Sequence, residues 1–209
     1  MDTIRVGRVK VTRRTRAVAV LLHGGRAEQP QPRRFHDVSY LRMTPFVGAV
    51  RRAGDGQVAP VLVHNGDGGW VASSGSGVRQ AREIIDRLVD EHRLPVILLG
   101  HSSGGWVALR AGDGAQVLGS VALAPWVGPQ DPIAHLQGKV VRVIHGEADR
   151  VCSPQRAQQY VEQLRASGVD ATYRSLPGGH ALLENPRRWH SEAARAVIEI
   201  AETSGATNR

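Results

Sequence analysis

Five short apolar runs, each ended by a turn-forming residue, constrain the fold of this chain most strongly. They are Ala17–Leu22, Val58–Val63, Pro95–Leu99, Val117–Leu123 and Val140–Ile144. A strand that is apolar at every position is typical of a parallel sheet whose two faces are both covered by helices. The runs therefore predict an α/β fold with a mostly parallel central sheet.

Amphipathic segments between these runs predict the helices. In residues 77–92 the apolar side chains recur at i, i+3 and i+4, which is the pattern of a helix with one buried face. Further helices are predicted over Leu41–Ala53, where Pro45 lies inside the helix or marks its first turn, and over Gly105–Ala111, Pro154–Ala166 and Trp189–Ala201. A sixth strand is predicted over Thr172–Leu176, and one or two antiparallel edge strands within the first fifteen residues. No long linker interrupts these segments, so residues 1–209 are expected to form a single domain.

The net charge of +8 is concentrated at the N-terminus. Residues 1–34 carry nine basic and two acidic residues, whereas the other 175 carry 18 basic and 17 acidic ones. The basic segment has no aromatic residue before Phe35 on which a base could stack, so no nucleic-acid partner is expected. The N-terminus lacks the apolar region of a signal peptide, and no apolar run is long enough to cross a membrane. With Cys152 as the only cysteine, a cytoplasmic protein without a membrane partner is expected.

The sequence Gly100-His101-Ser102-Ser103-Gly104 is the feature that points most directly to chemistry. It follows a predicted strand, precedes a predicted helix and has the form G-x-S-x-G. Glycines flank Ser102 because a sharp strand-to-helix turn leaves no room for side chains beside it. The unpaired N–H groups at the start of the following helix face any negative charge that develops there. This pattern predicts that Ser102 is a nucleophile.

A serine hydroxyl needs a base to activate it, and the base needs a carboxylate to orient it. In a parallel sheet both are expected in the loops after later strands. Asp149 lies in the loop after the fifth apolar run, and Glu147 in the same loop is the rival acid. His180 lies in a glycine-rich loop after the sixth predicted strand, and His64 is the alternative base.

Three motifs together resemble the α/β-hydrolase family. They are the pentapeptide around Ser102, the H-G-x-x-D segment His145–Asp149, and Gly179-His180. The resemblance covers the chain from Ala17 to the last predicted helix. It implies Ser102 as nucleophile, His180 as general base and Asp149 as the orienting acid. His145 is then expected to be structural, and the His101 side chain to point away from the tip of the turn.

The resemblance also implies an oxyanion hole made of two backbone N–H groups. One is expected from Ser103 and the other from Gly25, with Arg26 as the alternative. Only fifteen residues, 124–138, separate the fourth apolar run from the strand beginning at Lys139, which leaves no room for a cap domain. Trp126 in this loop is a candidate for contact with the substrate.

The residues predict a serine hydrolase that cleaves a carboxylic ester or thioester of a small molecule through an acyl-enzyme. An acyl-transferring, cyclising or thioesterase enzyme of a biosynthetic pathway would use the same three residues. A binding protein built on a hydrolase scaffold is a third reading. The sequence contains no CxxC, HExxH, Walker A or GxGxxG motif, so neither a metal nor a cofactor is expected.

Overall fold

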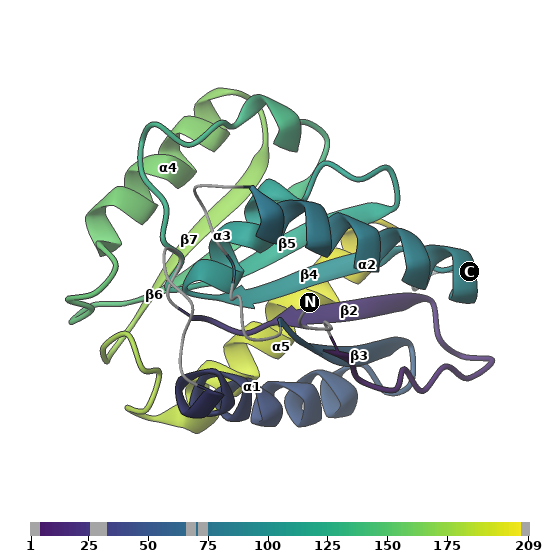
Figure 1. The fold of residues 1–209 in the computed structure, drawn as a ribbon. Coiled ribbons are helices and arrows are strands. Elements are labelled where there is room, and N and C mark those ends of the chain that lie inside the picture. Colours follow the sequence, from purple (N-terminus) through teal and green to yellow (C-terminus); the bar gives the residue numbers. More distant parts are fainter. Residues whose placement is uncertain (1–4, 26–32, 66–69, 71–74, 206–209) are drawn as a thin grey trace.

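A seven-stranded sheet organises the protein (Figure 1), and the computed structural model describes residues 5–25, 33–65, 70 and 75–205. The strands are β1 (Arg5–Val6), β2 (Ala17–Leu22), β3 (Val58–His64), β4 (Val96–His101), β5 (Val117–Leu123), β6 (Val140–Gly146) and β7 (Asp170–Leu176). The helices are α1 (Arg33–Ala53), α2 (Ser76–His92), α3 (Ser103–Arg110), α4 (Pro154–Ala166) and α5 (Pro186–Thr203), with a 3-10 turn at Ala134–Leu136. The predicted α/β fold is therefore confirmed.

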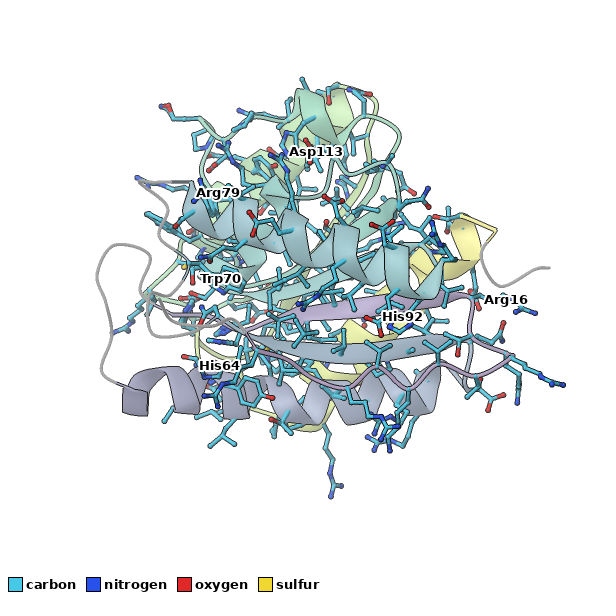
Figure 2. All side chains as sticks on the ribbon, turned by 45° about the vertical axis from the view of Figure 1, so that its right-hand side comes forward. Arg16, His64, Trp70, Arg79, His92 and Asp113 are labelled. Carbon is cyan, nitrogen blue, oxygen red and sulfur yellow. The ribbon has the colours of Figure 1, made fainter. Side chains whose placement is uncertain are left out.

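The strand order places Ser102 at a switch point of the sheet, where strands that follow each other in sequence are added on opposite sides. The order is β1-β3-β2-β4-β5-β6-β7, with β1 antiparallel to β3 and the other neighbouring pairs parallel. After β2 the chain first adds β3 on one side and then returns to add β4 on the other. In open parallel sheets the crevice outside the carboxyl ends of the strands at such a point is the usual ligand site. Figure 2 shows His64 and Trp70 at this end of the sheet and Arg16 at the opposite end.

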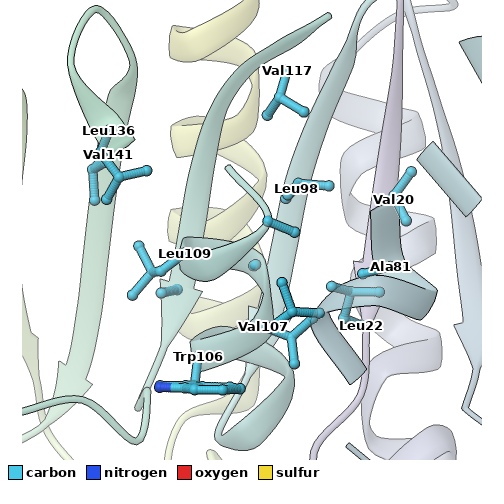
Figure 3. Packing of buried hydrophobic residues seen from close by; sticks show 14 of the residues in the cluster. Val20, Leu22, Ala81, Leu98, Trp106, Val107, Leu109, Val117, Leu136 and Val141 are labelled. Atoms are coloured by element: carbon cyan, nitrogen blue, oxygen red, sulfur yellow. The ribbon is translucent and has the colours of Figure 1, made fainter. Parts of the chain in front are cut away.

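Each face of the sheet has its own apolar core, which explains why β2 is apolar at every position. In β2, Val18, Val20 and Leu22 belong to the cluster on the side of α2, α3 and α4, part of which is shown in Figure 3. Ala17, Ala19 and Leu21 alternate with them and belong to the cluster formed with α1 and α5. Successive side chains of a strand point to opposite faces, so a strand covered on both sides, such as β2, packs apolar side chains in both directions.

Helix α1 differs most from the sequence prediction. It begins at Arg33 rather than at Leu41, and of the two predicted positions for Pro45 the structure has the one inside the helix. A proline inside a helix removes one backbone hydrogen bond. The helix continues through it because Met43, Phe46 and Val50 are fully buried against the sheet, and this packing offsets the lost bond. Of the one or two antiparallel edge strands predicted in the first fifteen residues, the described part, from residue 5 on, has one, Arg5–Val6, which pairs with β3.

The segment between β5 and β6 is a loop, as the fifteen-residue spacing predicts, and it contains the 3-10 turn Ala134–Leu136. No separate cap domain occurs in the part of the chain that the structure describes. Among these same residues, no helix is both long enough and apolar enough to cross a membrane.

Candidate active site

Ser102 stands at a strained turn between β4 and α3. Its backbone has φ 56° and ψ −122°, a conformation that side-chain-bearing residues rarely adopt. The two flanking glycines make the turn possible. A Cβ at Gly100 would overlap the carbonyl oxygen of Gly104, and one at Gly104 would overlap the carbonyl oxygen of Leu22. The turn at residues 100–104, called the elbow from here on, therefore packs against β2. This brings the loop that follows β2 close to Ser102.

Ser102, His180 and Asp149 form a continuous chain of hydrogen bonds across three loops. His180 Nε2 lies 2.9 Å from Ser102 Oγ, and His180 Nδ1 lies 2.9 Å from Asp149 Oδ2. An ionised carboxylate only accepts hydrogen bonds, so the proton of the neutral imidazole is on Nδ1. Nε2 is then the acceptor for the Ser102 hydroxyl. The structure thus brings together the three residues that the sequence singles out, in an arrangement suited to removing the serine proton.

The environment of Asp149 keeps it ionised. Burial alone would raise the pKa of the Asp149 carboxyl, but the hydrogen bonds from the Cys152 N–H, the His180 ring and the Val151 N–H outweigh it and lower that pKa. The two backbone N–H groups lie 2.9 and 2.8 Å from Oδ1. One carboxylate oxygen is therefore held by the loop, and the other is directed to His180.

His101 touches the site although the sequence predicts that its side chain points away. Its Nε2 lies 2.9 Å from the carbonyl oxygen of His180, and the two rings lie 5.0 Å apart. Burial, as the largest cause, and the nearby His180 ring, as the second, lower the pKa of His101 to about 3. His101 is therefore neutral, and its Nε2–H donates to the backbone of His180. The only sequence signal for this contact is that His101 precedes Ser102.

Cys152 contacts the site through its backbone. The sequence places it beside the acid loop with no role, whereas in the structure it is buried and its N–H donates to Asp149 Oδ1 at 2.9 Å. Burial, together with the charge of Asp149, raises the pKa of the Cys152 thiol to about 12. The thiol is therefore protonated and is not a competing nucleophile.

The candidate oxyanion loop is tied to the elbow. Ser103 Oγ donates to the carbonyl oxygen of Gly25 at 2.8 Å, which joins the loop after β2 to the start of α3. The N–H of Ser103 lies in the first turn of α3, where N–H groups have no partner within the helix. Arg26, the alternative donor, lies outside the described residues.

The alternative base and acid lie elsewhere. The ring of His64 packs against the rings of Tyr40 and His23, at 5.2 and 5.4 Å. Glu147 is exposed and accepts a hydrogen bond from Ser175 Oγ at 3.2 Å. Within the described ranges, no group of three or more His, Cys, Asp or Glu side chains is placed to hold a metal ion.

Trp126 lies directly beside the elbow. Its backbone N–H donates to the carbonyl oxygen of Ser102 at 3.4 Å, and the residue is 41% exposed although it is large and apolar. The ring of Trp106 supports it, with 6.5 Å between the two ring centroids. An exposed apolar side chain fixed next to Ser102 can contact an apolar group of a bound ligand.

The buried neutral His101 predicts that the protein loses stability in mild acid. Its folded pKa of about 3 lies below the value of about 6.5 for an unfolded histidine, so the unfolded state binds the extra proton as the pH falls below that value. From pH 7 to pH 5 this group is expected to lower the free energy of unfolding by about 2 kcal/mol. Burial also lowers the pKa of His145, which acts in the same direction.

Urea unfolding at pH 7, 6 and 5 measures this loss. Gln at position 101 does not titrate, so the His101→Gln variant is expected to lose less stability over the same pH range than the wild type. Equal losses in the two proteins would show that His101 titrates normally in the folded state.

Comparisons with known proteins bear on the fold. No protein-family model matches the sequence, and no curated protein does either. Solved structures do match. A lidless α/β serine hydrolase from Xanthomonas campestris is 19% identical, with a TM-score of 0.68 over 94% of this chain and 88% of that one. A thermophilic esterase from Thermogutta terrifontis is 14% identical, with a TM-score of 0.71 over 97% and 89%. A monoacylglycerol lipase from Paleococcus ferrophilus is 18% identical, with a TM-score of 0.64 over 97% and 99%.

Identities this low relate the chain to these proteins by fold alone. The chain has a mostly parallel sheet with helices on both of its faces, and the match to those structures extends over nearly its whole length. The protein therefore has the α/β-hydrolase fold and resembles those members that have no lid.

Proposed function

We propose that the protein is a serine hydrolase that cleaves a carboxylic ester or thioester of a small molecule. Ser102 is the nucleophile, His180 the general base and Asp149 the acid that orients His180. The observation that carries the proposal is the pair of 2.9 Å contacts that link these three side chains at a strained strand-to-helix turn. Two of the similar structures, an esterase and a lipase, support esters as the first substrates to test.

The proposed reaction has two halves. In the first, His180 Nε2 takes the proton of Ser102 while Oγ bonds to the carbonyl carbon of the substrate. The carbonyl oxygen becomes an oxyanion, for which the N–H groups of Ser103 and Gly25 are the proposed donors. His180 then gives its proton to the departing alcohol or thiol, leaving an acyl-enzyme on Ser102. In the second half, water repeats these steps with the acyl-enzyme and releases the acid.

A panel of substrates tests the proposal. The protein is assayed with p-nitrophenyl esters from acetate to dodecanoate and with thioesters of the same acids, with and without an added alcohol as acyl acceptor. Release of free acid in both conditions supports hydrolysis, whereas a new ester formed only with the alcohol favours acyl transfer. Folded protein that gives no product with any member of the panel would contradict the proposal.

We expect Trp126 to contribute to the binding of longer acyl or alcohol groups. Replacing it with alanine removes apolar surface beside Ser102, and about 1 kcal/mol of lost contact corresponds to roughly a fivefold fall in kcat/KM. The fall should be seen with octanoate esters and be smaller with acetate esters, which do not reach the indole. Val11, equally exposed at 41%, precedes β2 at the opposite end of the sheet, so Val11→Ala is the matched control. Equal losses for acetate and octanoate would remove Trp126 from the substrate site.

A further inference from the structure

The carboxylate of Asp149 is shared by two histidines. Its Oδ2 oxygen lies 2.9 Å from His180 Nδ1 and 3.1 Å from His145 Nε2. The side chains of Asp149 and His145 are fully buried, and His180 is largely buried. The reaction proposed above uses the contact to His180 and leaves the contact to His145 without a role.

The partners of His145 determine where its proton is. Nε2 faces two acceptors, Asp149 Oδ2 and the carbonyl oxygen of Cys152 at 3.2 Å, so Nε2 carries the hydrogen. Nδ1 is buried and has no hydrogen-bond partner among the described residues. A proton on Nδ1 would leave a buried donor unpaired, which is costly. The neutral ring with its hydrogen on Nε2 is therefore the form that this site accommodates.

We propose that His145 is a positioning residue, whose Nε2–H fixes the Oδ2 oxygen of Asp149 on the His180 ring and withdraws part of its negative charge from that ring. The inference rests on the proposed roles of Ser102, His180 and Asp149. The two backbone donors hold Oδ1, so the rotation of the carboxylate is restricted from both sides. Without His145, only His180 itself would restrain Oδ2.

This role has a consequence that packing alone would not have. The donor end of His145 reduces the attraction between Asp149 and a protonated His180, so removing it stabilises the protonated ring. The other titratable or charged groups that act on these residues are His101, whose Nε2–H donates to the His180 carbonyl oxygen, the thiol of Cys152, the phenol of Tyr173 near Asp149, and Arg42 near His101. None of them changes charge between pH 5 and pH 8, because burial holds the pKa of His101 near 3, raises the pKa of Cys152 to about 12 and raises that of Tyr173, and an arginine stays protonated over this range. Loss of the His145 donor should therefore move the pH midpoint of His180 titration upward.

The test compares His145→Gln with His145→Met. The two side chains are similar in length and differ in that glutamine has an N–H donor at the ε position and methionine has none. NMR of protein with isotope-labelled histidine follows the His180 ring from pH 5 to pH 9, with His180→Gln used to assign its signals. The methionine variant is expected to shift the midpoint upward by about half a pH unit or more, and the glutamine variant to stay near the wild type. The acid limb of the kcat/KM profile should move in parallel.

His135→Met is the control for a general effect of losing a histidine. His135 Nε2 donates to the carbonyl oxygen of Leu109, 3.1 Å away in the last turn of α3, whereas Ser102 precedes the first turn of that helix. The His135→Met variant should leave the His180 midpoint unchanged. Equal midpoints in the glutamine and methionine variants would overturn the proposal, whether or not they differ from the wild type.

A measurement on the unaltered protein guards against a variant that does not fold. The ¹⁵N shifts of His145 report which ring nitrogen carries hydrogen, and a hydrogen on Nδ1 rather than Nε2 would overturn the proposal directly. Neither NMR measurement needs turnover. A protein that shows the predicted midpoint shift but hydrolyses nothing would refute the proposed function and leave the role of His145 toward Asp149 intact.

Discussion

Replacing Ser102 with alanine is expected to lower kcat for any ester that the wild type hydrolyses by about 10⁴- to 10⁶-fold. The variant retains His180, Asp149 and the backbone donors but has no oxygen to form the acyl-enzyme. The residual rate would come from binding the substrate next to these donors, with water as the attacking group. The fold should persist, because the glycines that permit the turn remain and alanine is smaller than serine.

Ser103 is the matched control for this substitution, since two serines stand side by side in the elbow. Ser103 Oγ donates to Gly25 O, whereas the hydroxyl that lies against His180 Nε2 is that of Ser102, so Ser103→Ala keeps the nucleophile and the Ser103 N–H. A loss of about tenfold is expected from a less well held oxyanion loop. If Ser103→Ala abolished turnover and Ser102→Ala retained it, the nucleophile would be Ser103 rather than Ser102. Thermal unfolding of both variants ensures that folded proteins are compared.

Replacing Asp149 with asparagine is expected to lower kcat near neutral pH by about 10⁴-fold. Asparagine keeps the shape of the side chain and can still accept from the Val151 and Cys152 N–H groups. It loses the negative charge that holds the hydrogen of His180 on Nδ1 and stabilises the ring once it has taken the serine proton. The imidazole would then spend most of its time in the form that cannot accept from Ser102.

Glu147→Gln provides the comparison, because Glu147 is the other carboxylate of the same loop. It is exposed and bonded to Ser175, so its replacement should change kcat by less than about twofold. Steady-state rates at several pH values, measured for both variants, decide between the acids. A large loss in Glu147→Gln together with a small one in Asp149→Asn would exchange their roles.

The central strands could be predicted from the sequence because they are buried on both faces. The prediction for β2 matches its observed bounds, since every one of its six side chains belongs to one of the two cores. Helix α1 could not be predicted in the same way. The sequence leaves Pro45 either inside the helix or in its first turn and does not show the turns before Leu41, whereas the packing of Met43 and Phe46 explains why the helix passes through Pro45.

The three proposed catalytic residues could be located because each follows a strand of a parallel sheet, so their loops meet at one edge. The contacts of His101, His145 and Cys152 could not be derived in this way. They depend on how the loop after β6 folds back onto the elbow and on the register of β6 with β7, and residue spacing carries neither. The isolated elbow pattern thus indicates a nucleophile, whereas its surrounding histidines become interpretable only with the structure.

Labelling with a fluorophosphonate probe tests the central claim most directly, because the probe bonds to a serine whose hydroxyl has been activated. Wild-type protein is incubated with the probe, digested, and the modified peptide identified by mass spectrometry, with His180→Gln treated in parallel. A single adduct on Ser102, formed far more slowly in His180→Gln, is the result that the account predicts. Folded wild-type protein that remains unlabelled, or that carries the adduct on a residue other than Ser102, would contradict it.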